Sequence, residues 1–68
     1  MNKLEATYNN EIIYIHYVSD DEEYCLVSYS KDETRKFKLN TVDIGGINKE
    51  QLVKFKLSQD GSLKGQIG

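Results

Sequence analysis

Residues 11 to 18 read EIIYIHYV, and the prediction of the fold starts from this segment. Ile, Tyr and Val are enriched in β-strands, and here they occupy both alternate sets of positions. Turn-forming residues flank the stretch, with Asn9 and Asn10 before it and Ser19 after it. We therefore predict a central β-strand with two apolar faces, and something must cover each of them.

The alternating pattern repeats along the rest of the chain. Apolar and polar residues alternate in segments separated by turn residues, which is typical of strands. The six expected strands lie near residues 3 to 8, 11 to 18, 23 to 30, 34 to 39, 52 to 57 and 62 to 67. Only residues 48 to 51 are expected to be helical, because Asn48 can cap a short turn with Gln51 three positions later.

These elements predict an all-β fold for residues 1 to 68 as a single domain. Six short antiparallel strands need two layers or closure to bury an apolar face. We expect a small antiparallel meander that curls into an SH3-like barrel or sandwich of five to six strands, with one short helical turn near 48 to 51.

The turns predict a register for the sheet. A two-residue turn at Asn9 and Asn10 pairs Leu4 with Ile15, and a loop over residues 19 to 22 pairs Ile15 with Leu26. A further loop over residues 30 to 33 pairs Leu26 with Phe37, and a loop over residues 59 to 61 closes the last hairpin. One face then holds Leu4, Ala6, Ile13, Ile15, Tyr17, Tyr24, Leu26, Phe37 and Leu39 as the core.

The opposite face of the same sheet is also apolar in this register. It would hold Ile12, Tyr14, His16, Val18, Cys25, Val27 and Tyr29, beside Lys36 and Lys38. One interpretation is that the curvature of the barrel or the last hairpin buries this face. The other is that part of it is an exposed patch for another protein or a second copy of the chain. The residues predicted to bind such a partner are Ile12, Tyr14, Val27, Tyr29, Lys36 and Lys38.

The charges are divided unevenly between the two halves of the chain. Residues 1 to 33 carry eight acids and two bases, whereas residues 34 to 68 carry seven bases and three acids, within an overall charge of −2. Such asymmetry can steer a charged partner or promote self-association. The alternative function is therefore nucleic-acid binding by a basic surface made of Lys36, Lys38, Lys54, Lys56 and Lys64. Outward lysines on strands also guard edges against aggregation.

The composition argues against catalysis. The single Cys25 and the single His16 exclude an intramolecular disulfide and a Cys/His zinc site within one chain. The register sets His16 opposite Cys25, yet a lone cysteine is usually a small core residue. Paired carboxylates in an apolar setting, a glycine-rich phosphate loop and a catalytic triad are all missing from the pattern. We expect no enzyme activity, cofactor, metal ion or small-molecule substrate.

No apolar run in the sequence has the length of a signal peptide or of a membrane span. An unpaired thiol fits a reducing compartment. The sequence therefore favours a small cytoplasmic protein-interaction module or accessory protein that acts through a Tyr/Val-rich sheet face.

Overall fold

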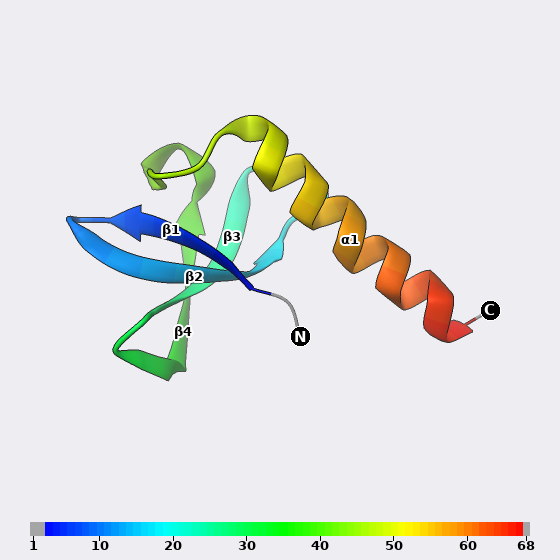
Figure 1. Cartoon of the computed structure of the whole chain (residues 1–68), viewed down its shortest axis with the longest axis horizontal. Coiled ribbons are helices and arrows are strands. Elements are labelled where there is room, and N and C mark those ends of the chain that lie inside the picture. The colour runs from blue at the N-terminus through cyan, green and yellow to red at the C-terminus, as the bar shows by residue number, and fades with distance from the viewer. Residues whose placement is uncertain (1–2, 68) are drawn as a thin grey trace.

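The chain folds into one antiparallel sheet and a C-terminal helix (Figure 1). The computed structural model describes the backbone of residues 3 to 67 and the side chains of residues 3 to 59. The elements are β1 (Leu4–Tyr8), β2 (Glu11–Val18), β3 (Tyr24–Tyr29), β4 (Asp32–Asn40), a 3-10 turn (Thr41–Asp43) and α1 (Lys49–Ile67).

The four strands pair in the order β1-β2-β3-β4, so the sheet is a meander. The prediction of a mainly antiparallel β meander is confirmed. The five- to six-stranded SH3-like barrel is not confirmed, because β1 and β4 form the two edges of an open sheet of four strands.

The predicted strands at residues 52 to 57 and 62 to 67 are wrong, because both segments belong to α1. The helix begins at the expected cap: the Gln51 amide donates to Asn48 Oδ1 over 2.8 Å, and the Asn48 amide donates to Gln51 Oε1 over 3.0 Å. The predicted helical turn at 48 to 51 is therefore the first turn of a helix of 19 residues. The three-residue hairpin loop at 59 to 61 is wrong for the same reason.

The β1-β2 hairpin has the predicted register. Leu4 pairs with Ile15 and Ala6 pairs with Ile13. Asn9 and Asn10 have φ angles of 54° and 63°, the left-handed conformation that a tight two-residue hairpin turn requires.

The predicted register between β2 and β3 is wrong, because the loop extends from Val18 to its partner Cys25, beyond the expected residues 19 to 22, and because β2 contains a β-bulge at His16. Ile15 pairs with Val27, but Tyr17 pairs with Leu26, so His16 is an extra residue on β2. A shift of one residue turns every side chain of a strand to the other face of the sheet. β3 is consequently inverted relative to the prediction.

The β3-β4 pairing is also one residue away from the prediction. Cys25 pairs with Leu39 and Val27 pairs with Phe37, whereas Leu26 pairs with Lys38. The inversion of β3 and this second shift offset each other, so β4 keeps its predicted orientation with Leu39 in the core.

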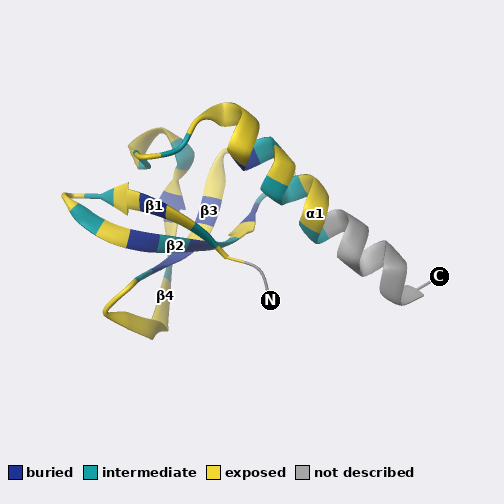
Figure 2. Ribbon diagram, in the orientation of Figure 1, coloured by how far each residue is buried: buried dark blue, intermediate teal, exposed yellow. Residues whose placement is uncertain are grey.

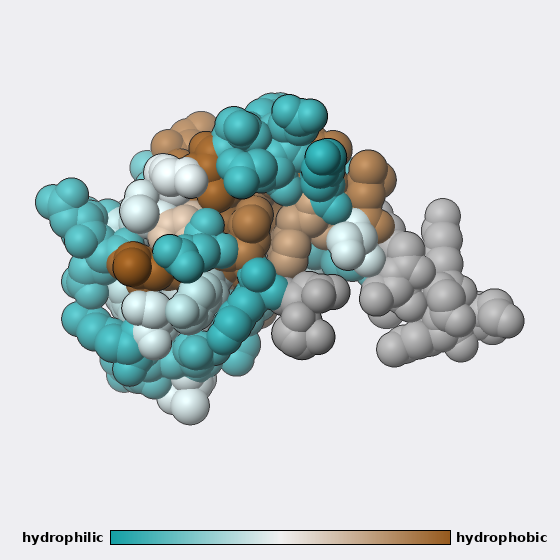
Figure 3. Space-filling model, viewed as in Figure 1, coloured by the Kyte–Doolittle hydropathy of each residue, from teal (hydrophilic) through white to brown (hydrophobic). Residues whose placement is uncertain are grey.

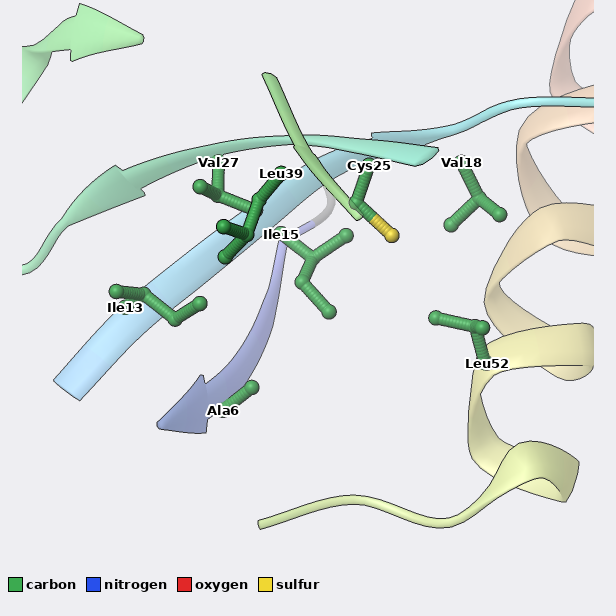
Figure 4. Close-up of a cluster of buried hydrophobic side chains, with 8 residues drawn as sticks. All are labelled: Ala6, Ile13, Ile15, Val18, Cys25, Val27, Leu39 and Leu52. Atoms are coloured by element: carbon green, nitrogen blue, oxygen red, sulfur yellow. The ribbon is translucent and has the colours of Figure 1, made fainter. Parts of the chain in front are cut away.

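One apolar core lies between the sheet, α1 and the segment that joins them (Figure 4). Its buried members are Ala6, Ile13, Ile15, Val18, Cys25, Val27, Leu39 and Leu52. Figure 2 shows that the buried positions lie along the middle of the strands and at the start of α1. The core prediction is correct for Ala6, Ile13, Ile15 and Leu39, whereas Tyr17, Tyr24 and Leu26 lie on the opposite face.

A pair of backbone hydrogen bonds and an ion pair hold α1 and its linker against the sheet. The backbone groups of Thr7 and Gly45 exchange hydrogen bonds of 2.9 and 2.8 Å, which join the linker to the free edge of β1. Lys56 on α1 forms a half-buried ion pair with Glu22 in the β2-β3 loop, at 3.3 Å. In the view of Figure 3, hydrophobic side chains gather where the sheet meets α1, so this junction is the interior side of the sheet.

Candidate interaction surface

Three exposed apolar side chains lie together on the face of the sheet turned away from α1, next to the β2-β3 loop. Tyr17 is 47% exposed, Tyr24 is 40% exposed and Leu26 is 37% exposed. Tyr17 and Leu26 are partners across β2 and β3, so their side chains lie side by side. We call this face the outer face, and we call Tyr17, Tyr24 and Leu26 the outer patch.

A shallow hollow of about 270 Å³ lies within the outer patch. Its lining residues are Tyr17, Ser19, Tyr24, Cys25, Leu26 and Lys38. The Lys38 ammonium lies 4.8 Å from the centre of the Tyr24 ring, so the lysine stem covers part of the aromatic surface. The outer patch is thus an apolar depression with a cation at its β4 side.

The β2-β3 loop supplies negative charge at the end of the outer patch next to Tyr24. The Asp21 carboxylate accepts hydrogen bonds from Ser19 Oγ at 2.7 Å and from the Glu23 amide at 3.0 Å. The bond from Ser19 is the main reason that the pKa of Asp21 is lowered. This end of the patch is therefore anionic at neutral pH.

His16 and Ser28 form a polar pair beside the outer patch. His16 Nε2 and Ser28 Oγ lie 2.8 Å apart, and Ser28 is fully buried. Burial lowers the pKa of His16, and the charge of Lys36 lowers it further. The lowered pKa favours the neutral imidazole, which has Ser28 as a hydrogen-bond partner.

An ion pair crosses the outer face near His16. Lys3 Nζ lies 2.6 Å from Glu33 Oε1, although the two residues lie at the starts of the two edge strands. The same ammonium lies 4.3 Å from the centre of the Tyr14 ring. The hydrogen bond from Lys3 is the main reason that the pKa of Glu33 is lowered. The ion pair and Tyr14 partly cover this end of the outer face, whereas the outer patch stays exposed.

The predicted juxtaposition of His16 and Cys25 is wrong. Cys25 pairs with Val18 and points into the core, whereas His16 is the bulged residue on the outer face. Burial raises the pKa of the Cys25 thiol. The two side chains therefore do not form a nucleophile-base pair.

The six predicted partner-binding residues do not form one surface. Val27 is fully buried in the core, and the Tyr29 ring lies 5.3 Å from that of Phe37 on the interior side. Ile12 is 46% exposed near the β1-β2 turn, away from the outer patch. Only Lys36 and Lys38 adjoin the outer patch, and Tyr14 lies further along the outer face.

The sequence prediction missed Tyr17, Tyr24 and Leu26 because no residue type near His16 requires a bulge. Before His16 the alternation of β2 is as predicted, and after it the alternation is reversed. These three residues were consequently assigned to the core.

The lysines proposed for nucleic-acid binding lie on different elements. Lys36 and Lys38 lie on β4, whereas Lys54 and Lys56 lie on α1, across the core from the outer face. The Lys56 ammonium is already paired with Glu22. The side chain of Lys64 lies outside the described residues.

A second hollow, of about 670 Å³, opens at the end of the sheet near the β1-β2 and β3-β4 turns. Three half-buried aromatic rings and three charged side chains line it: Tyr8, Tyr29, Lys31, Asp32, Arg35 and Phe37. The Tyr8 and Phe37 rings lie 6.5 Å apart, so β1 and β4 approach each other here. We call this the aromatic hollow.

Neither a metal-binding cluster nor a bilayer-spanning helix occurs in the part of the chain that the structure describes. No group of three or more Cys, His, Asp and Glu side chains there has an arrangement that holds a metal ion. Over the same residues, no helix combines the length and the apolar character of a bilayer span.

Comparisons with protein-family models, with curated proteins and with solved structures find no match to this chain.

Proposed function

We propose that this chain is a small non-catalytic protein-interaction module of the cytoplasm that acts through the outer patch. The observation that carries the proposal is the exposure of three adjacent large apolar side chains, Tyr17, Tyr24 and Leu26, on one sheet face. A cluster of exposed apolar side chains with a polar rim is typical of a surface that binds another protein. Tyrosine is enriched at such surfaces because it contributes both apolar area and a hydroxyl group.

The surroundings of Cys25 and His16 support a role without catalysis. Each is the chain's single residue of its type, and the sheet separates them. The Cys25 thiol is held in its protonated form, which is a poor nucleophile. A reduced, unpaired thiol is also what a cytoplasmic protein carries.

A photo-crosslinking experiment tests this proposal. The photoreactive amino acid p-benzoylphenylalanine replaces Tyr24 in the full chain, which is then irradiated in an extract of its source cells. The matched control carries the same group at Leu57, which is 61% exposed on α1. We expect a discrete heavier product from position 24 and none from position 57. Equal products from both positions, or none from position 24, would contradict the proposal.

Nucleic-acid binding is the second candidate function, and the aromatic hollow favours it. The sequence prediction lacked aromatic residues among the lysines, but the structure sets Lys31 and Arg35 beside Tyr29 and Phe37. Aromatic rings that stack bases next to cations that contact phosphates are the common means of binding single strands. Lys31 is partly neutralised, because its ammonium lies 2.9 Å from Glu11.

Fluorescence anisotropy with labelled single- and double-stranded oligonucleotides tests the second candidate. Binding through the aromatic hollow predicts a preference for single strands and a loss of affinity between about 50 and 200 mM salt. The variant Arg35→Ala should weaken binding, whereas Lys54→Ala on α1 should leave it unchanged. Absence of salt-sensitive binding at low ionic strength would remove this candidate.

A further inference from the structure

Charges of opposite sign lie at opposite ends of the outer patch. Asp20, Asp21 and Glu23 lie in the loop before β3, beyond the Tyr24 end of the patch. Lys38 pairs with Leu26, and Lys36 lies two residues further along β4, away from that loop. The patch therefore has an apolar centre, an acidic end and a basic side that extends to the other end.

A two-fold axis that lies in the plane of the patch and runs across the strands matches unlike charges at its ends. In an isologous dimer each copy uses the same surface, and rotation by 180° about this axis brings one end of the patch against the other end in the second copy. The acidic loop of one copy then faces Lys36 of the other, while the apolar centres meet at the axis. We infer that the partner of the outer patch is a second copy of this chain, bound in this antiparallel arrangement. The inference rests on the proposed function, because it names the partner of the same surface.

The apolar centre and the charged ends have different roles in this dimer. Removing the exposed parts of Tyr17, Tyr24 and Leu26 from water supplies the attraction. Unlike charges at the two ends select the antiparallel orientation and accelerate encounter. A parallel arrangement would set the two acidic loops against each other, at a cost in like-charge repulsion.

Other partners fit the surface less well. A polyanion would meet Lys36 and Lys38 but would be repelled by Asp20, Asp21 and Glu23. A polycation would be attracted by these acidic residues but would be repelled by Lys36 and Lys38. A partner with the same bipolar distribution satisfies both ends, and a copy of this chain has that distribution.

Sedimentation of the purified full chain over a range of concentrations tests the inference. We expect a monomer-dimer equilibrium that weakens as salt is added, because exposed charge pairs are screened. Leu26→Asp should weaken the dimer at least about tenfold, since it places a charge in the apolar centre. Leu57→Asp makes the same change on α1 and should leave the dimer unaffected.

A charge-swap cycle tests the arrangement of the two copies. Glu23 and Lys36 are both exposed, so changes at either should leave the monomer folded. Glu23→Lys and Lys36→Glu should each weaken the dimer by about three- to tenfold. The double variant should return to within about twofold of the parent, because the swapped charges again face their opposites. Lys54→Glu on α1 is the control for net charge and should have no effect.

Three outcomes would overturn the inference. They are a parent chain that remains monomeric at about 1 mM, a loss of dimer in Leu57→Asp as large as in Leu26→Asp, and a double charge variant weaker than either single variant. If the chain is monomeric but position 24 still crosslinks in the cell extract, the inference fails and the proposed function stands with a different protein. If the chain is monomeric and position 24 gives no crosslinked product, both the inference and the proposed function fail.

Discussion

The side-chain amide of Gln59 on α1 forms two hydrogen bonds with the backbone of Val18 on β2. The Val18 amide donates to Gln59 Oε1 at 3.1 Å, and Gln59 Nε2 donates to the Val18 carbonyl at 2.8 Å. β1 pairs with β2 only as far as Ile15, so the next positions of β2 have no strand on that side. Gln59 thus occupies the place that a neighbouring strand would take.

Replacing Gln59 tests how α1 is held against the sheet. Gln59→Leu keeps the size of the side chain but leaves the Val18 amide and carbonyl without a partner. We expect a loss of about 1 to 3 kcal/mol in the free energy of unfolding, measured by urea denaturation. Ser58→Ala, at the exposed neighbouring position, is the control and should change little. A Gln59→Leu variant as stable as the parent would show that α1 does not depend on this contact.

The environment of His16 predicts a pH dependence of stability. Burial and Lys36 lower its pKa in the folded chain, whereas in the unfolded chain the pKa is about 6.5. The unfolded state therefore binds a proton first as the pH falls, and stability decreases from about pH 6.5 down to the lower pKa of the folded state. The measurement is thermal unfolding between about pH 7.5 and 5.

The control for this prediction is His16→Gln, which cannot titrate. It should lose much less stability over the same range. Asp21, Asp32 and Glu33 also have lowered pKa values. Their contribution is present above their unfolded pKa values, and it is lost only as the pH falls through lower values, below about 4. Equal pH dependence of His16→Gln and the parent between pH 7.5 and 5 would contradict the assignment.

Cys25 is expected to be protected from thiol reagents. The side chain is 1% exposed, and its raised pKa keeps the thiol protonated. Reaction with Ellman's reagent should be at least roughly a hundredfold slower in the folded chain than in urea, because it requires local opening. As a control, the double variant Cys25→Val, Leu26→Cys moves the thiol to the outer patch and should react quickly. Equal rates for Cys25 in the folded and unfolded chains would place it on the surface.

The parts of the fold that local chemistry determines were predictable from the sequence. The Asn9-Asn10 turn adopts the left-handed angles of a tight hairpin, and this alone set the β1-β2 register. The reciprocal hydrogen bonds of Asn48 and Gln51 mark the start of α1 in the sequence and in the structure.

The helix itself could not be recognised from alternation. Val53, Phe55 and Leu57 alternate with lysines, which matches the period of a strand. The residues that contact the sheet instead follow helical spacing, with Leu52 in the core, Phe55 packed against it and Gln59 bonded to Val18. The same residues fit both the alternation of a strand and the spacing of a helix, and the contacts with β2 distinguish the two.

The candidate surface depends on the bulge, and the alternation of apolar and polar residues does not predict that bulge. Shifting β3 by one residue exchanges Leu26 for Val27 in the core and exposes Tyr24. The doubly apolar character of β2 predicted a second apolar face, but the register decides which residues form it. The sequence placed Tyr14 and Lys38 on that face, where they lie, but it also placed the buried Val27 there and assigned the exposed Leu26 to the core.

The stability of two neighbouring variants, Leu26→Asp and Val27→Asp, tests the inverted register of β3 most directly. Val27 is fully buried and Leu26 is on the outer patch, so Val27→Asp should abolish the folded state while Leu26→Asp should stay within about 1 kcal/mol of the parent. Circular dichroism during thermal unfolding at low protein concentration, where self-association does not contribute, gives both values. A folded Val27→Asp together with an unfolded Leu26→Asp would contradict the account.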